Sequence, residues 1–186
     1  MKTYLVTGAA GFIGANYIKH ILAKHDDVKL VILDALTYAG NLGTIAKDID
    51  DERCIFVKGD ICDRVLADEL FAKFKFDYVV NFAAESHVDR SIENPQLFLV
   101  TNILGTQNLL DAARRAWVTG KDENGYPTCA RVYAIIRFLP MKCMAHWVPK
   151  DTSQSKLRFA RTVLTVLPKQ VPIWWLWLIM IRIRCR

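Results

Sequence analysis

A glycine-rich segment directly after an apolar run constrains the fold of this chain more than any other feature. Residues 4–6 (Tyr-Leu-Val) are apolar, and Gly8, Gly11 and Gly14 follow with the spacing G-x-x-G-x-x-G. The pattern predicts a strand, a tight turn and a helix N-terminus, where free N–H groups and the helix dipole favour a diphosphate. Gly8 would permit the turn, Gly11 the approach of a ligand, and Gly14 close packing of helix on strand. Three glycines alone are a weak signal and would favour a plain turn.

An acidic residue follows at the distance that a dinucleotide-binding fold requires. A second apolar run, residues 28–33, ends at Asp34, twenty positions after Gly14. In such folds a carboxylate at this point accepts hydrogen bonds from the adenosine ribose. It would also repel the 2′-phosphate of NADP, so NAD is the predicted cofactor. The alternative is an aspartate that only closes a strand as a helix cap.

A third strand with its helix comes next. Residues 54–57 predict a short strand that leads to Asp60 and Ile61, and Asp63 begins an amphipathic helix that extends to about Phe74. Beside an adenine ring, Asp60 would accept from the exocyclic amine and Ile61 would form an apolar wall. A turn residue explains Asp60 equally well.

The fourth strand ends in a polar segment. Residues 77–82 predict a fully buried parallel strand, and residues 83–90 follow its carboxyl end. Ligands bind at the carboxyl ends of the strands in open α/β sheets, so this segment lies at the ligand-binding edge. A long helix is predicted from Pro95 to about Trp117, with Thr101 on its cofactor-facing side. Together these units predict an α/β fold with a doubly wound parallel sheet, a Rossmann-like NAD-binding domain.

Four segments resemble the dTDP-glucose 4,6-dehydratases, a family of extended short-chain dehydrogenases/reductases in nucleotide-sugar metabolism. They are the glycine turn, residues 34–41 (D-A-L-T-Y-A-G-N), residues 59–63 (G-D-I-C-D) and residues 83–92 (A-A-E-S-H-V-D-R-S-I). The glycine turn is shared by the whole superfamily, whereas the T-Y-A-G-N and A-A-E-S-H-V-D-R-S-I stretches separate this family from the sugar epimerases. The resemblance extends from residue 1 to about 128. Ala35 departs from it, because a lysine is expected there near the adenosine ribose.

The resemblance implies which residues contact the ligands. Those implied for NAD are Gly8, Gly11, Phe12, Ile13, Gly14, Asp34, Ala35, Leu36, Thr37, Asp60, Ile61, Phe82, Ala83, Ala84 and Thr101. Ser86 would approach the substrate, dTDP-glucose, and Glu85 and His87 would flank it. A surface or structural histidine is the alternative for His87. The resemblance also implies a homodimer and no metal.

The catalytic segments of the family are missing from this sequence. The family oxidises the sugar at C4 with NAD, eliminates water across C5 and C6, and returns the hydride to C6. A Y-x-x-x-K tyrosine is the base for oxidation, and the Asp-Glu pair of an S-T-D-E segment handles the elimination. Neither segment occurs here, and Tyr133 with Arg137 four places later is a poor substitute. The chain therefore has no catalytic residue of the family and is predicted to be inactive. A related nucleotide-sugar epimerase and a non-catalytic NAD-binding fragment are the alternatives.

The composition changes abruptly after Thr128. Residues 131–186 carry a net charge of +10 against −4 for residues 1–130, and they hold four of the five tryptophans. A nucleic-acid-binding arm would suit the charge, but the basic residues show no periodic face or motif. A membrane anchor would suit residues 173–181, but nine residues fall well short of the roughly twenty that span a bilayer. Neither nucleic acid nor a membrane is a predicted partner.

A shifted reading frame accounts better for this tail. If one base is missing at Cys129, codons compatible with residues 134–147 can be read two bases later as Y-H-Q-V-S-T-D-E-V-Y-G-S-L, which contains S-T-D-E. The same shift allows P-Y-S-A-S-K within residues 162–169 and M-A-Y-H-D-T-Y-K-M-P for residues 177–186.

We therefore predict an NAD-binding domain over residues 1–128, truncated after its fourth strand. A polar loop is expected over residues 120–127. An irregular, out-of-frame tail without an assignable domain is expected over residues 129–186. No apolar leader follows Met1, which predicts a cytoplasmic protein.

Overall fold

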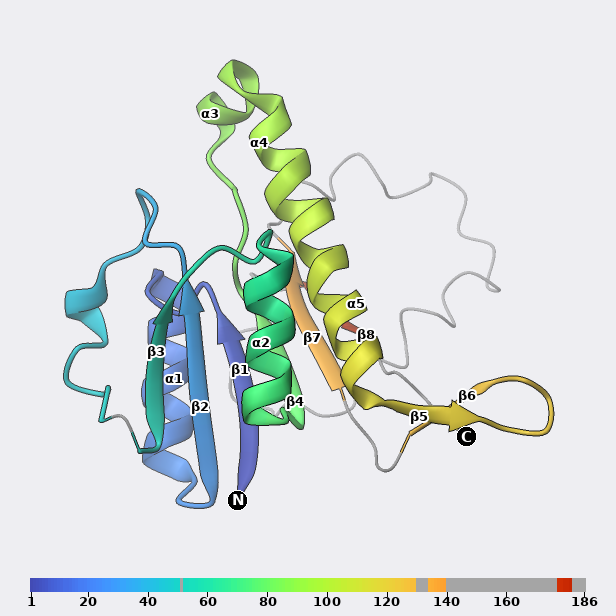
Figure 1. The fold of residues 1–186 in the computed structure, drawn as a ribbon. Helices are drawn as coiled ribbons and strands as arrows, with labels where there is room; N and C mark the ends of the chain where they lie inside the picture. The colour runs from blue at the N-terminus through green and yellow to red at the C-terminus, as the bar shows by residue number, and fades with distance from the viewer. Residues whose placement is uncertain (51, 130–133, 140–176, 182–186) are drawn as a thin grey trace, which may run out of the picture.

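A computed structural model of the chain describes residues 1–50, 52–129, 134–139 and 177–181 (Figure 1). The strands are β1 (Lys2–Thr7), β2 (Val28–Asp34), β3 (Cys54–Lys58), β4 (Tyr78–Asn81), β5 (Val118–Lys121), β6 (Pro127–Cys129), β7 (Ala134–Leu139) and β8 (Trp177–Ile181). The helices are α1 (Phe12–Lys24), the short 3₁₀ helix η1 (Leu42–Thr44), α2 (Arg64–Phe74), α3 (Val88–Glu93), α4 (Pro95–Leu99), the π-helical stretch η2 (Val100–Gly105) and α5 (Thr106–Trp117).

The main sheet has the strand order β3-β2-β1-β4-β7-β8. Its first five strands run parallel, and β8 pairs antiparallel with β7. After β1 the chain continues to β2 on one side, and after β4 it continues to β7 on the other side. The point between β1 and β4 is therefore a switch point, where ligands bind in open α/β sheets. The predicted doubly wound α/β fold is confirmed.

Helices cover both faces of the sheet, and neighbouring residues of one strand supply the two cores. Leu5 packs into the core that contains α2 and α5, while Val6 packs into the core that contains α1. Figure 1 shows α2 and α5 in front of the sheet and α1 behind it. Side chains alternate between the faces of a strand, so a strand covered on both sides is apolar at nearly every position. This explains the continuous apolar runs of the sequence.

The predicted helices begin at the residues that cap them. Asp63 caps α2, accepting a hydrogen bond from the backbone N–H of Leu66 at 3.0 Å. Asn94 caps α4 in the same way, with Pro95 at the first helical position. From there α4, η2 and α5 follow one another without a break to Trp117, whose indole N–H donates to the carbonyl of Phe76 at 2.8 Å. The single long helix predicted over 95–117 therefore forms, with a π-helical stretch in its middle.

The predicted polar loop over 120–127 is present at residues 122–126, and its ends belong to an antiparallel hairpin, because Thr119 donates from its hydroxyl to the carbonyl of Thr128 and β5 pairs with β6. The expectation that the sheet stops after four strands was wrong. The run Ala134–Ile136 is apolar with two β-branched residues, which suits a buried parallel strand, and β7 pairs with β4 over Tyr78–Asn81.

Candidate functional site

The turn between β1 and α1 requires glycine at position 8. Gly8 has a φ of +66°, and a Cβ added to it would lie 2.5 Å from the backbone nitrogen of Ala83. Backbone atoms cannot rotate away as a flexible side chain can, so a larger residue would be strained and would also collide with the end of β4. The turn after β1 is therefore pressed against the segment that leaves β4.

Gly14 and Gly11 have different roles in the same turn. A Cβ on Gly14 would lie 2.5 Å from the carbonyl oxygen of Gly8, so α1 packs directly on the turn. A Cβ on Gly11 would have only that same oxygen near it, at 3.3 Å. Since Gly11 lines a cleft, its missing side chain leaves the backbone accessible from the cleft. Helix α1 has no side-chain cap at this end, which leaves its first N–H groups available to an anion.

Asp34, at the end of β2, links two loops of the cleft through hydrogen bonds from their backbone N–H groups. Its Oδ2 accepts from the backbone N–H of Ala10 and its Oδ1 accepts from that of Leu36, each at 2.8 Å. The side chain is buried but lines the cleft. A carboxylate has about four acceptor positions, so Asp34 retains capacity for hydroxyl donors of a ligand. Leu36 has a φ of +53°, a strained conformation for a residue with a side chain, and its bond to Asp34 helps to hold it.

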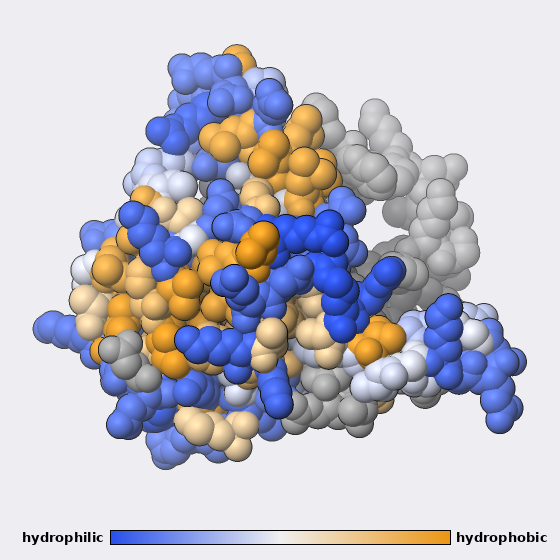
Figure 2. All heavy atoms as spheres, in the orientation of Figure 1, coloured by the Kyte–Doolittle hydropathy of each residue, from blue (hydrophilic) through white to orange (hydrophobic). Residues whose placement is uncertain are grey.

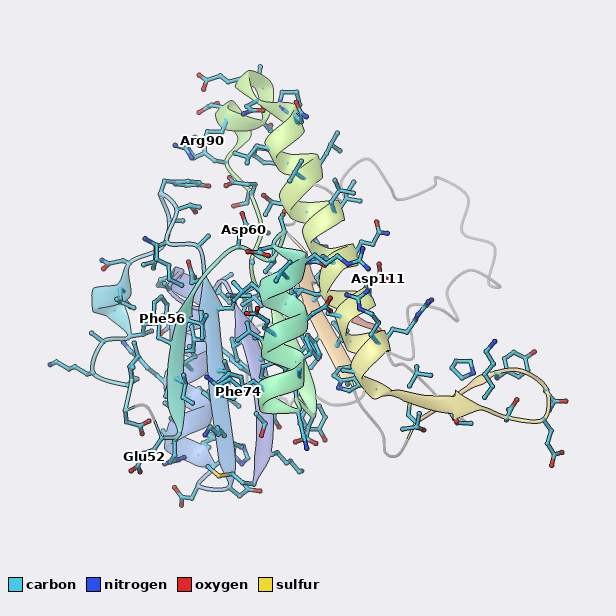
Figure 3. The ribbon with its side chains drawn as sticks, viewed as in Figure 1. Glu52, Phe56, Asp60, Phe74, Arg90 and Asp111 are labelled. Atoms are coloured by element: carbon cyan, nitrogen blue, oxygen red, sulfur yellow. The ribbon has the colours of Figure 1, made fainter. Side chains whose placement is uncertain are left out.

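The segment after β3 contributes Asp60 and Ile61. Asp60 is exposed, and its Oδ1 accepts from the backbone N–H of Cys62 at 2.9 Å. Ile61 is buried, and its carbonyl accepts from the side-chain amide of Asn108 in α5 at 2.7 Å. In Figure 3, Asp60 lies at the end of the sheet where β3 leads into α2. One acceptor and one apolar side chain are therefore adjacent at this end of the cleft.

The segment after β4 is held by η2. The side-chain oxygen of Asn102 accepts from the backbone N–H of Glu85 at 3.0 Å, and its amide donates to the carbonyl of Glu85 at 2.9 Å. The carboxylate of Glu85 is buried and lines the cleft, and its Oε2 has no hydrogen-bond partner among the described residues. A buried carboxylate oxygen without a donor is costly, which suggests a donor from a ligand. Ser86 and Thr101 line the cleft nearby.

The ring of Tyr38 contacts the side chains of both Arg90 and His87 beside this segment. The guanidinium carbon of Arg90, in α3, lies 4.0 Å from the centre of the Tyr38 ring, and the His87 ring meets Tyr38 edge-on with centroids 6.2 Å apart. Desolvation raises the pKa of the Tyr38 hydroxyl, and the negative charge of Glu85 adds to this, whereas Arg90 opposes it. Tyr38 follows β2 and Arg90 follows β4, so the loops on either side of the glycine turn are in contact.

These segments enclose one cleft of about 650 Å³. The structure brings together in its lining nearly all the residues predicted for it: Gly8, Gly11, Phe12, Ile13, Gly14, Asp34, Ala35, Thr37, Asp60, Ile61, Phe82, Ala83, Ala84, Glu85, Ser86 and Thr101. Leu36 and His87 are not among the lining residues; Leu36 packs instead against the core beneath α1.

Sequence reasoning missed six lining residues: Leu33, Ala39, Gly40, Gly59, Arg90 and Leu97. Ala39, Gly40 and Gly59 follow strands within segments that the sequence analysis singled out, which was an available signal, whereas Leu33 lies inside β2 and Leu97 inside α4. Gly40 is also explained by packing, since its Cβ would lie 2.9 Å from the Cα of Leu36. Arg90 ends the polar segment 83–90 that the sequence places at the ligand-binding edge, but its stacking on Tyr38 depends on a contact between two loops that the sequence does not show.

Within the described part of the chain, no helix combines the length and apolar character needed to cross a bilayer. No group of three or more potential metal-ligating side chains lies together in residues 1–50, 52–129, 134–139 and 177–181.

Known proteins with similar sequences and structures share this region. The family described as GDP-mannose 4,6 dehydratase matches residues 5–134. A dTDP-glucose 4,6-dehydratase of Xanthomonas campestris pv. campestris is 52% identical over 117 residues, which cover 63% of this chain and 33% of that protein.

Solved structures match the same part of the chain. DesIV, a dTDP-glucose 4,6-dehydratase of Streptomyces venezuelae crystallised with NAD, has a TM-score of 0.57 and 44% identity over 61% of this chain and 36% of its own. A UDP-glucose 4-epimerase of Brucella ovis in complex with NAD has a TM-score of 0.54 and 33% identity over 62% of this chain and 33% of its own. The chain thus spans about a third of the length of the relatives it matches.

Proposed function

The chain belongs to the family described as GDP-mannose 4,6 dehydratase, and we propose that its residues 1–128 form the NAD-binding domain of a dTDP-glucose 4,6-dehydratase. The single observation that carries the proposal is the accessible backbone at Gly11, between a glycine turn that no larger residue fits and the uncapped N-terminus of α1. The packing of the described residues restricts position 11 much less than positions 8 and 14, because an added Cβ would have only the carbonyl oxygen of Gly8 near it, at 3.3 Å. Close approach of a diphosphate would require glycine there.

The residues present fit the cofactor along the whole cleft. The glycine turn would hold the diphosphate, and Asp34 would accept from the adenosine ribose hydroxyls with its remaining acceptor positions. Asp60 and Ile61 would lie beside the adenine, while Ala83, Ala84 and Thr101 would line the other half. The negative charge of Asp34 favours NAD over NADP, whose 2′-phosphate it would repel.

The proposed reaction of the complete enzyme converts dTDP-glucose to dTDP-4-keto-6-deoxyglucose and water. NAD, when bound, supplies a transient hydride acceptor. This chain would contribute Ser86, Glu85 and His87 near the sugar, but its sequence contains neither S-T-D-E nor Y-x-x-x-K. We therefore expect it to bind NAD without catalysing dehydration. The similarity to an epimerase at 33% identity keeps a related nucleotide-sugar epimerase as the second candidate.

We also propose that the codons after residue 128 are read one base out of frame. The restored frame places S-T-D-E over codons 138–142, at the carboxyl end of β7 (Ala134–Leu139). Because β7 is the parallel neighbour of β4, those carboxylates would follow the strand beside the one that leads to Glu85 and Ser86. The position agrees with the rule that catalytic side chains gather where parallel strands end. This agreement supports the proposal from an observation that the back-translation did not use.

NAD binding tests the first proposal. We expect the fluorescence of NADH to increase on addition of the 186-residue chain, and Gly11→Val to abolish the increase because a side chain would block the backbone. Gly120→Val is the matched control, since Gly120 lies in the exposed strand β5 away from the cleft and valine suits a strand. Equal NADH affinity of the parent and Gly11→Val would refute the assignment.

The coding DNA tests the second proposal. We expect the bases around codon 129 to be a tryptophan codon that lacks one base, and the following codons to spell the shifted sequence. An insertion of one base at that codon should then produce a chain that converts dTDP-glucose to a 4-keto product, read as its absorbance in alkali. Codons incompatible with the shifted frame would reject the proposal without affecting NAD binding.

A further inference from the structure

The charges of the cleft raise a problem for any ligand that carries a diphosphate. Among the described residues that line it, three bear carboxylates, Asp34, Asp60 and Glu85, and one bears a positive charge, Arg90. A dinucleotide or a nucleotide sugar brings two further negative charges. The N–H groups at the start of α1 offer only the partial charge of the helix dipole, equivalent to about half an elementary charge. A cation that lines the cleft would offset part of the excess.

Arg90 is the cation that lines this cleft among the described residues. Its guanidinium stacks on the ring of Tyr38 at 4.0 Å, and no ion pair of Arg90 exists within the described part of the chain. Stacking engages the flat face of a guanidinium and leaves its N–H groups, which lie in the plane, free to bind phosphate oxygens. Figure 3 shows Arg90 beyond the end of the sheet at which Asp60 lies.

The order of the strands places this pair relative to the glycine turn. Strand β1 lies between β2 and β4, so the loop with Tyr38 and the segment with Arg90 leave the sheet on opposite sides of that turn. Their contact joins the two sides. Tyr38 is itself fixed by the strongly bonded loop between Asp34 and Asn41, where Gly40 donates to the carbonyl of Thr37 at 3.0 Å. The hydrogen bonds of this loop therefore hold the Tyr38 ring in position against the guanidinium of Arg90.

We propose that Arg90 is a diphosphate-binding residue of the cleft and that Tyr38 positions it by stacking. The ligand class is a nucleoside diphosphate derivative, either the dinucleotide cofactor or the nucleotide sugar. The inference rests on the proposed function, which needs a diphosphate in the cleft, and adds a binding residue that the glycine pattern does not contain.

The affinity of the full 186-residue chain for NADH, ADP, adenosine and dTDP-glucose tests this inference, with the last three measured by competition against NADH or by thermal stabilisation. We expect Arg90→Ala to weaken the binding of NADH and ADP about 10- to 100-fold, the range of a charge-assisted hydrogen bond. The affinity for adenosine should not change, because adenosine has no phosphate. Weakening of dTDP-glucose alone would also support the inference and would identify the nucleotide sugar as the source of the diphosphate. Unchanged affinity for every diphosphate, or an equal loss for adenosine, would overturn it.

Variants at Tyr38 and the salt dependence separate binding from a structural role. Tyr38→Phe keeps the stacked ring and should bind as the parent does, whereas Tyr38→Ala should lose part of the affinity that Arg90→Ala loses. The difference in NADH affinity between the parent and Arg90→Ala should shrink at 1 M salt, because salt screens an exposed charge. A difference in affinity that stays the same at 1 M salt would contradict the inference. Arg115→Ala is the control, since Arg115 pairs with Asp68 away from the cleft. If the parent binds neither NADH nor ADP, the proposed function fails instead.

Discussion

Replacing Gly8 by alanine should destabilise the fold through two effects that the structure allows to be separated. At a φ of +66° a side chain costs about 1–2 kcal/mol of free energy. The added Cβ would also lie 2.5 Å from the nitrogen and 2.7 Å from the Cα of Ala83, and forcing an atom into a well-packed site costs about 1–3 kcal/mol. The expected total for Gly8→Ala is about 2–5 kcal/mol of unfolding free energy.

Gly125 offers a matched control within the same chain. It has a φ of +79° in the β5–β6 hairpin, and a Cβ added there would meet nothing within 4 Å. Gly125→Ala therefore carries the conformational cost alone, about 1–2 kcal/mol. Each Gly→Ala substitution lowers the conformational entropy of the unfolded chain by the same amount, so this effect cancels when the two variants are compared. The difference between them isolates the collision with β4, about 1–3 kcal/mol.

Urea unfolding followed by circular dichroism at the helical minimum would measure both variants against the parent. We expect the midpoint to fall further for Gly8→Ala than for Gly125→Ala, with the slope of the transition unchanged. Equal midpoints for the two variants would show that the turn is not pressed against the segment after β4. The geometry on which the NAD-binding proposal rests would then be wrong.

Three further outcomes follow from single contacts or surfaces. Asp34→Asn should lose one of two 2.8 Å backbone hydrogen bonds, at a cost of about 1–3 kcal/mol in urea unfolding, and should bind NADH more weakly; unchanged stability would contradict the bridging role. Burial raises the pKa of the Cys54 thiol to about 12 and that of Cys62 to about 11, from an ordinary value of 9.0. The unfolded chain then releases protons first, so unfolding free energy should fall as pH rises from 9 through 11 to 12, and Cys54→Ala should reduce that fall. Finally, Leu99, Ile103 and Leu104 are more than half exposed on the helix through η2, where Figure 2 shows apolar side chains gathered, so the 186-residue chain should be poorly soluble in ultracentrifugation; a soluble, active monomer would refute this.

Much of the nucleotide-binding half was predictable because local chemistry determines it. A residue with a φ near +66°, such as Gly8, is most easily glycine, and a helix that starts after Asp63 needs a capping acceptor. The turn and the start of the helix can therefore both be predicted from the residue types at these positions. The continuous apolar runs similarly predicted strands that are covered on both faces. The distance from Gly14 to Asp34 followed from the length of one helix and one strand.

Contacts between distant segments were decided only by the tertiary structure. Nothing near Tyr38 in sequence indicates that Arg90 stacks on it, because that pair forms only when β1 separates the strands that carry the two loops. The hydrogen bonds of Asn102 to Glu85 likewise depend on the long helix lying against the segment after β4. The fifth parallel strand was missed because its residues 134–139 lie in a tail of altered composition, yet β4 offered an open edge whose backbone groups it satisfies. Sequence determined the glycine turn for which a diphosphate is proposed. Packing decided which side chains surround that turn, since a pattern records neighbours along the chain and not neighbours in space.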